Sequence, residues 1–248
     1  MDGMLRCARY AFGPNRLHYC GPNKSEDIAA HIGESSATEG LRETMTQFET
    51  MYPYLRHIAH ANAVGDPLDA RVVEAYWLGN ELLTRAGGKP LYRLLFDTIA
   101  RHKKGDSKFR EHLIEMLRNH AVPHHSFHVF SIWKKENAAS PEELLAKIDE
   151  CRIGWGEITD IAGPKIIVKT RLLERQNDGR VRLSQETTKV LIRRLESEYD
   201  IDMLEIGDTV SYHWSVPCEK ISPEQAARLE YATRQNIGFI NTSPSFLP

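Results

Sequence analysis

A histidine and a cysteine near the end of the chain have residue types and spacing that suit a transition metal. In "GDTVSYHWSVPC" (207–218), apolar and polar residues alternate after a glycine-aspartate turn, which predicts a short strand. His213 falls on the polar face, with Tyr212 and Trp214 on the opposite face, toward the core. Histidine and cysteine are the softer metal ligands of proteins. We therefore expect His213 to face a metal, with Cys218 as either a third ligand or a buried thiol.

The other cysteines extend the set of candidate ligands. The chain has four, namely Cys7, Cys20, Cys151 and Cys218, too few and too scattered for a disulfide scaffold. Cys7 and Cys20 lie among turn signals, where they could bind the same metal or form a redox pair. Their spacing is not that of a zinc knuckle. Ordinary burial under the helices is the interpretation we favour for these two.

Histidines in the first half of the chain allow another iron chemistry. His57 and His60 would share a helix face, Glu74 lies on the next helix, and "HHSFH" supplies His124, His125 and His128. Histidine and glutamate inside a helical bundle are typical of non-haem iron enzymes. The Glu-x-x-His motif does not recur, however. We therefore expect these histidines to be solvated or to cap helices.

Composition excludes several classes of function. The formal net charge is −2 over 248 residues, which argues against a general polyanion binder. No run approaches the roughly 18 apolar residues that a membrane helix needs. The start of the sequence lacks the apolar core of a signal peptide. We expect a cytoplasmic protein of one or two domains that binds neither membrane nor nucleic acid.

The elements that position these residues divide the chain in two. Residues 1–36 predict irregular structure with turns at 13–15 and 21–23. Amphipathic helices are expected between residues 38 and 121, including 65–88, 89–105 and 107–121, and a further helix opens at Ser140-Pro141. Residues 1–149 are therefore predicted to form an α-helical domain with a cysteine-containing N-terminal segment.

The predicted secondary structure changes from helices to short strands at residue 150. Turn signals at 163–164 and 177–179 separate strand-like runs, further strands are expected at 189–192 and 209–214, and Ser222-Pro223-Glu224 opens a helix. No regular pattern is visible over 238–248. The predicted fold class is α+β, with residues 150–248 forming a small closed barrel of the five-stranded OB type plus a C-terminal helix.

Two motifs in this second half resemble a known family. "CRIGWGEI" (151–158) fits Cys-x-x-x-x-Gly-x-Ile, and "GDTVSYH" (207–213) fits Gly-Asp-x-Val-x-x-His, followed by a turn and a helix that starts acidic. In order and spacing, roughly the last hundred residues resemble the small hydrogenase maturation chaperones HypC, also called HupF. The N-terminal "CARYAFGPNRLHYCGP" is similar to an uncharacterised group of proteins of comparable size.

The resemblance implies a function. In that family the matching residues, Cys151 and His213 here, would hold iron as Fe(CN)2(CO) and pass it to the precursor of the nickel-iron hydrogenase large subunit. The implied partners are this precursor and a HypD-like iron-sulfur scaffold protein, which the helical domain would recognise. No catalytic turnover is implied. Two alternatives stay open: an iron enzyme built on the helical domain, and an OB-type oligonucleotide-binding module.

Overall fold

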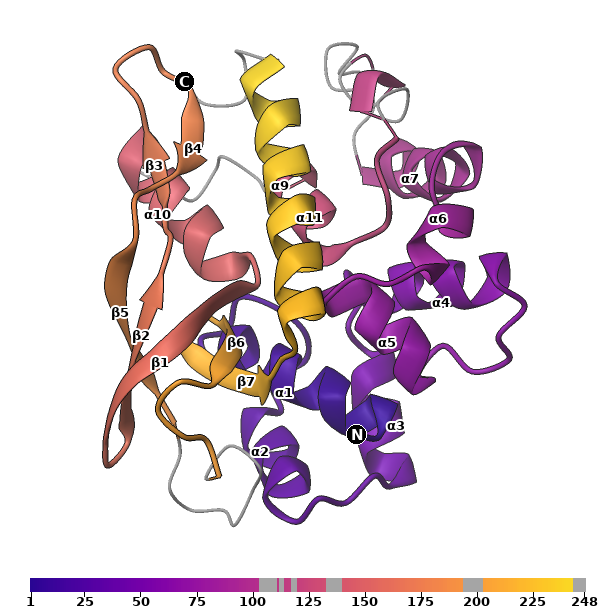
Figure 1. The fold of residues 1–248 in the computed structure, drawn as a ribbon. Helices are drawn as coiled ribbons and strands as arrows, with labels where there is room; N and C mark the ends of the chain where they lie inside the picture. Colours follow the sequence, from indigo (N-terminus) through magenta and orange to yellow (C-terminus); the bar gives the residue numbers. More distant parts are fainter. Residues whose placement is uncertain (103–110, 112–113, 117–119, 133–139, 194–202, 243–248) are drawn as a thin grey trace.

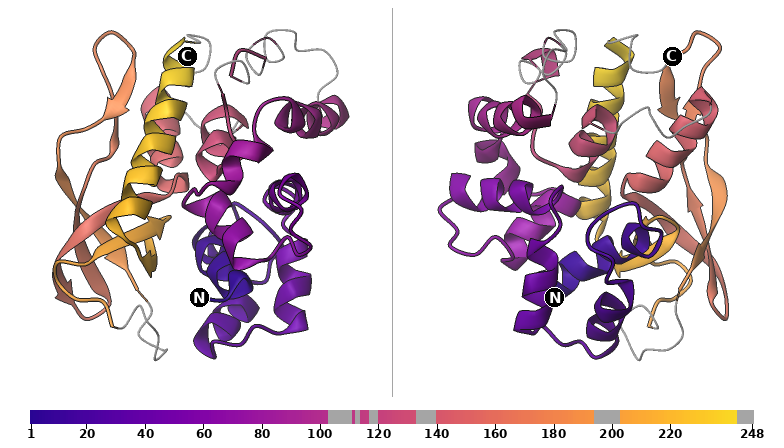
Figure 2. Two further views of the ribbon diagram at one scale, coloured as in Figure 1. Left: turned by 45° about the vertical axis from the view of Figure 1, so that its right-hand side comes forward. Right: turned by 180° about the vertical axis from the view of Figure 1, so that it is seen from behind.

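The molecule has a helical side and a sheet side, with a long helix between them. The structure is a computed structural model that describes residues 1–102, 111, 114–116, 120–132, 140–193 and 203–242. Helices from the first half of the chain gather opposite an antiparallel sheet, and the last helix runs between the two (Figure 1, Figure 2). The fold is thus a mixed α and β fold in which helices precede the sheet and a helix follows it, as predicted.

The described residues before position 152 are mainly helical. The helices are α1 (Gly3–Arg16), α2 (Ser25–Gly33), α3 (Glu39–Thr46), α4 (Tyr52–Ala61), α5 (Ala70–Trp77), α6 (Leu82–Ala86), α7 (Lys89–His102), α9 (His125–Ile132) and α10 (Pro141–Cys151). Hydroxyl caps begin two of them, since Thr38 accepts from the Leu41 amide and Ser140 accepts from the Glu143 amide. The helix expected over 107–121 lies largely outside the described residues.

The expectation of an irregular start is wrong, because α1 and α2 occupy residues 3–16 and 25–33. Pro14 lies inside α1, where it lacks the amide that would donate to the carbonyl of Tyr10 four residues earlier. That carbonyl is instead 2.7 Å from Nδ1 of His213, which donates to it. A bond to the sheet thus replaces the missing helical bond, and α1 continues through a Gly-Pro pair that predicts a turn.

The sheet has five antiparallel strands in the order β5-β2-β1-β6-β7. Its strands are β1 (Gly154–Ala162), β2 (Lys165–Thr170), β5 (Thr187–Ile192), β6 (Thr209–His213) and β7 (Val216–Lys220), while β3 (Leu173–Arg175) and β4 (Val181–Leu183) form a separate hairpin. The predicted closed barrel is not confirmed, because this order leaves β5 and β7 as edges. The Ile192 amide at one edge donates to the Ser215 carbonyl, which belongs to the turn before β7 and to no ladder.

β7 is missing from the sequence prediction, which places a turn and a helix after His213. Trp214 and Ser215 form the β6–β7 turn with φ values of 51° and 58°, a conformation that favours glycine or asparagine. Contacts with the end of α10 stabilise it. The Trp214 amide donates to the Glu150 carbonyl at 2.9 Å, and Ser215 Oγ donates to the Glu150 carboxylate at 2.8 Å. Trp214 therefore lies in a turn next to α10, which corrects its predicted place on the strand.

The hydrophobic core is shared by both halves of the chain. Buried side chains of α1, α4 and α5 belong to the same cluster as Ile153, Val216 and Cys218. A second cluster lies among α9, α10, the β3–β4 hairpin and the last helix, and a third covers one face of the sheet around Tyr212. The division predicted between residues 149 and 150 falls inside α10.

The last helix, α11 (Pro223–Thr242), begins where the sequence predicts. Ser222 and Gln225 exchange hydrogen bonds between their amides and each other's side chains, which forms a capping box. The helix continues to Thr242, so the expectation of an irregular segment is wrong for residues 238–242. None of the helices in the described parts of the chain combines the length and the apolar character needed to cross a membrane.

Candidate metal centre

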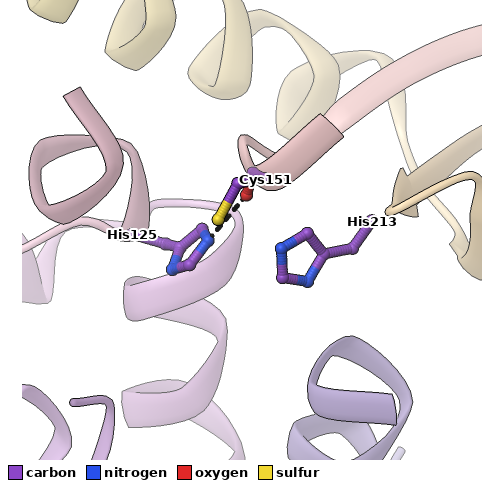
Figure 3. Close-up of side chains that lie close together, drawn as sticks. All are labelled: His125, Cys151 and His213. Carbon is purple, nitrogen blue, oxygen red and sulfur yellow. Dashed lines mark hydrogen bonds between the residues drawn. The ribbon is translucent and has the colours of Figure 1, made fainter. Parts of the chain in front are cut away.

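Three potential metal ligands converge where the helical side meets the sheet. Ligand atoms of His125, Cys151 and His213 all lie within 4.8 Å of one another. His125 is the first residue of α9, Cys151 is the last of α10, and His213 is the last of β6. Figure 3 shows their side chains pointing toward one another. Both histidines are buried, and Cys151 is partly exposed. Within the described residues, this is the one group of three or more His, Cys, Asp or Glu side chains with such spacing.

Neighbouring backbone contacts fix the distance between Cys151 and His213. The Trp214 amide donates to the Glu150 carbonyl at 2.9 Å, so the residue after the histidine is bonded to the residue before the cysteine. On the other side, Gly154 pairs with the tyrosine that precedes His213 in the β1–β6 ladder. A Cβ atom at Gly154 would lie 2.2 Å from that tyrosine ring, so only glycine permits this approach.

A buried ion pair anchors the segment on the other side of Cys151. Nε of the fully buried Arg152 donates to Oδ1 of Asp149 at 2.8 Å. Arg152 Nη2 donates to the Arg171 carbonyl at 2.6 Å, and Asp149 Oδ1 also accepts from the Leu173 amide at 2.9 Å. These bonds join the end of α10 to the link between β2 and β3. Removing either residue would leave the charge of the other unpaired in the core, so this ion pair holds the segment firmly in place.

His213 is held in one tautomer. Its Nδ1 lies 2.7 Å from the Tyr10 carbonyl, which can only accept, so Nδ1 carries the proton and Nε2 has a free lone pair. Nε2 is buried and makes no hydrogen bond of normal geometry, although the Cys151 backbone lies near it. Burial lowers the pKa of His213 to about 4. A neutral imidazole with a backbone carbonyl at one nitrogen is the usual form of a metal-binding histidine.

His125 uses both ring nitrogens. Nε2 donates to the Cys151 carbonyl at 2.9 Å (Figure 3). Nδ1 accepts from the Tyr76 hydroxyl at 3.1 Å. Burial, and then the charge of His213, hold the pKa of His125 well below its usual value. Metal binding through Nε2 would move the proton to Nδ1, and the Tyr76 oxygen could then accept from it. The Tyr76 hydroxyl thus suits both the metal-free and the metal-bound ring, whereas the Cys151 carbonyl would lose its donor when metal binds.

Cys151 is a protonated thiol at neutral pH. Burial raises its pKa to about 12, a nearby Cys20 charge would raise it further, and a hydrogen bond with the Trp214 side chain opposes the shift. A nucleophilic cysteine needs a lowered pKa, and the two neutral imidazoles here provide no positive charge. A metal ion would provide that charge and displace the thiol proton. The arrangement therefore suits a metal ligand better than a nucleophile.

A family model matches residues 1–245 and so spans both halves and all three candidate ligands. The chain belongs to the family of unknown function DUF6390. Comparison with curated proteins and with solved structures gives no match. The likeness of residues 151–248 to HypC stays a prediction from the two motifs.

The remaining cysteines lie outside the group of three ligands. Cys7 is in the helical core, with its Sγ 3.2 Å from Sδ of Met51. Cys218 is fully buried on β7, and its Sγ lies 3.8 Å from the Arg9 carbonyl. Cys20 is partly exposed in the segment after α1, near enough that its charge would influence the thiols of Cys7 and Cys151.

The histidines of "HHSFH" are used differently from the prediction. His124 caps α9, since its Nδ1 accepts from the Ser126 amide at 3.0 Å, and this capping role is confirmed. Solvation is wrong for His124 and His125, which are both buried. The sequence pattern pairs His124 with His128 on one helix face, but α9 begins at His125. That start directs His125 toward Cys151, which is why sequence analysis missed this third candidate ligand.

The other predicted iron ligands do not converge among the residues that the structure describes. Nε2 of His57 bonds to the Ala86 carbonyl at 2.7 Å, and His60 is exposed. The Glu74 carboxylate accepts from the Gln225 side-chain amide at 2.7 Å. The bonds of His57 and Glu74 join helices, and with the exposed His60 these residues form no converging set of ligand atoms.

Proposed function

We propose that the protein is an accessory protein of nickel-iron hydrogenase maturation that binds the Fe(CN)2(CO) unit and delivers it to the large-subunit precursor. The observation that carries this proposal is the juxtaposition of Cys151 and His213. These are the two residues that the HypC-like motifs single out, and they lie at ligand distance although they are far apart in sequence. Unrelated chance motifs give no reason for such proximity.

The chemistry of the three side chains suits this cargo. A thiolate is a strong donor to low-spin iron, and neutral imidazole is a weaker, exchangeable ligand. Cys151 would lose its proton on binding, while His213 presents its lone pair without any proton loss. His125 adds a third protein ligand, and the two cyanides and one carbonyl would complete six-coordinate iron.

Delivery needs a path out of the protein. Cys151 is the ligand with partial exposure, whereas His213 is 2% exposed. We expect the cargo to leave on the Cys151 side, toward a bound large-subunit precursor. A HypD-like scaffold protein would supply the iron unit, and the helical side offers surface for recognising either partner. The chain would act by binding and transfer, without catalytic turnover and without the need for a closed barrel.

Infrared spectroscopy tests the proposal directly. The protein would be purified without oxygen from cells that express the hydrogenase maturation genes, beside Cys151→Ala, His213→Ala and His125→Ala. We expect cyanide and carbonyl stretching bands in the wild type, their loss in Cys151→Ala and His213→Ala, and weaker or shifted bands in His125→Ala. Cys218→Ala is the matched control, because it removes a buried thiol from the neighbouring strand, and its bands should persist.

One result would overturn the assignment of Cys151, and another would overturn the carrier function itself. Bands that persist in Cys151→Ala would place the cargo at another thiol. Bound metal without cyanide or carbonyl bands would indicate a resident metal ion and exclude a carrier of this unit.

A further inference from the structure

We infer that α1 is a working part of the metal site: Pro14 frees the Tyr10 carbonyl, and this carbonyl holds His213 in the tautomer that presents Nε2 to the metal. The inference deepens the proposed function, since it rests on His213 being a ligand. The hydrogen bond itself belongs to the metal-free protein and can be tested there. Tyr10 and Pro14 are positioning residues, because neither would contact the metal.

The free carbonyl follows from the position of Pro14. In an α-helix the amide of residue 14 donates to the carbonyl of residue 10, and proline has no such amide. Tyr10 is fully buried, so an unpaired carbonyl there would cost free energy. Nδ1 of His213 donates to this carbonyl at 2.7 Å and satisfies it. This hydrogen bond therefore replaces the missing helical bond of the Tyr10 carbonyl. It also fixes the imidazole proton on Nδ1, the nitrogen that faces away from the metal.

Gly13 permits the close approach that this bond requires. A Cβ atom at Gly13 would lie 2.6 Å from the His213 carbonyl and 3.3 Å from Cβ of Trp214. Glycine inside a helix costs about 1 kcal/mol relative to alanine, and proline costs more. The Gly-Pro pair is thus unfavourable for α1 in isolation. Contact with the end of β6 explains why both residues occur at this point of the helix.

The side chain of Tyr10 fixes the position of its own carbonyl. The hydroxyl bonds to Ser211 Oγ at 2.7 Å and donates to the Glu219 carboxylate at 3.0 Å. The Tyr10 ring stacks on Trp77 with centroids 5.1 Å apart, and the Trp77 ring lies 5.7 Å from that of His213. Because α1 is bonded to both β6 and β7, the carbonyl cannot easily move away from the imidazole.

The tautomer matters because neutral imidazole has one lone pair. If the Tyr10 carbonyl were taken by a helical amide, Nδ1 would lose its acceptor and the proton could reside on Nε2. A proton on Nε2 blocks the position that a metal would take. Loss of such a hydrogen-bond partner typically lowers metal affinity by about 10–100-fold. The helical half would thus contribute both His125 and the orientation of His213.

Pro14→Ala is the decisive variant, because it restores the competing amide and leaves every side chain of the site in place. In metal-free protein labelled with nitrogen-15 at histidine, two-dimensional NMR should show His213 as the Nδ1–H tautomer in the wild type. We expect an appreciable Nε2–H population in Pro14→Ala and about tenfold weaker binding of cobalt(II). Pro53→Ala is the matched control, since Pro53 lies in the first turn of α4, where the amide has no helical acceptor.

Tyr10→Phe separates the carbonyl from the hydroxyl, because it keeps the backbone and removes the bonds to Ser211 and Glu219. This variant should keep the wild-type tautomer, because the free carbonyl, the stacking of the ring on Trp77 and the Arg6–Glu219 ion pair between α1 and β7 all remain. A Pro14→Ala protein with His213 still wholly in the Nδ1–H form would overturn the inference. So would a Tyr10→Phe protein that shifts as much, since general loosening of α1 would then explain both. Infrared bands from the iron unit play no part in this readout, so the proposed function can fail independently.

Discussion

Acid should destabilise the metal-free protein well above the pH at which carboxylates titrate, because the histidines around the candidate site are buried and neutral. Burial lowers the pKa of His124 and of His213 to about 4, against 6.5 for an unperturbed histidine. Between these two values the unfolded chain binds more protons than the folded protein. The contribution of these neutral histidines to the free energy of unfolding is therefore fully present above pH 6.5 and is lost as the pH decreases toward 4.

The size of the effect follows from these pKa values. At about pH 5 a histidine in the unfolded chain is mostly protonated, whereas His124 and His213 in the folded protein are mostly neutral. The difference amounts to about 2 kcal/mol for each, or about 4 kcal/mol together. His125 acts in the same direction, since burial and the charge of His213 lower its pKa. Because domains are stable by only about 5–15 kcal/mol, this loss is large.

Urea unfolding of metal-free protein, followed by circular dichroism near neutral pH and near pH 5, measures this loss. His213→Gln should remove about 2 kcal/mol of this loss, because the other buried histidines, His124, His125 and His128, remain. An unfolding free energy that changes by less than about 1 kcal/mol between the two conditions would refute the reasoning from burial.

Two further substitutions test how the site is held in place. Gly13→Ala would stabilise an ordinary helix, but here the added Cβ meets the His213 carbonyl, so we expect a loss of about 1–3 kcal/mol in urea unfolding; an increase in stability would contradict this contact. Asp149→Ala leaves the buried Arg152 without its carboxylate and should cost about 3–5 kcal/mol. Thermal unfolding would measure it, and a wild-type midpoint would show that the pair is not an anchor.

The parts of the fold that sequence predicts are those with local signals. Ser140 and Ser222 lie before proline and glutamate, and both begin helices as expected. The glycine turns at 163–164 and 177–179 separate strands as expected. The failures have a common cause, which is long-range contact. Pro14 is accommodated by a bond to the sheet. The Trp214–Ser215 turn is held by α10, so no short window of sequence reveals it.

The candidate site, like the fold, can be predicted from sequence only in part. Cys151 and His213 could be named from motifs, because each motif has a glycine and a strand at fixed spacing. Their proximity could not be derived, since it depends on the pairing of β1 with β6 and on the bond between Trp214 and Glu150. His125 carries no motif. Its role depends on where α9 begins and on the packing of that helix against the end of α10.

All three candidate ligands lie at the end of an element, and this bears on the proposed carrier function. Backbone carbonyls at the ends of helices lack helical partners, which makes them available to orient imidazoles. The Cys151 carbonyl accepts from Nε2 of His125 in the metal-free protein, and Pro14 creates a free carbonyl within α1 that accepts from Nδ1 of His213. Ligands at such ends can separate through local movement, without unfolding the shared core. A site that has to hold an iron unit and later release it would gain both properties from this placement.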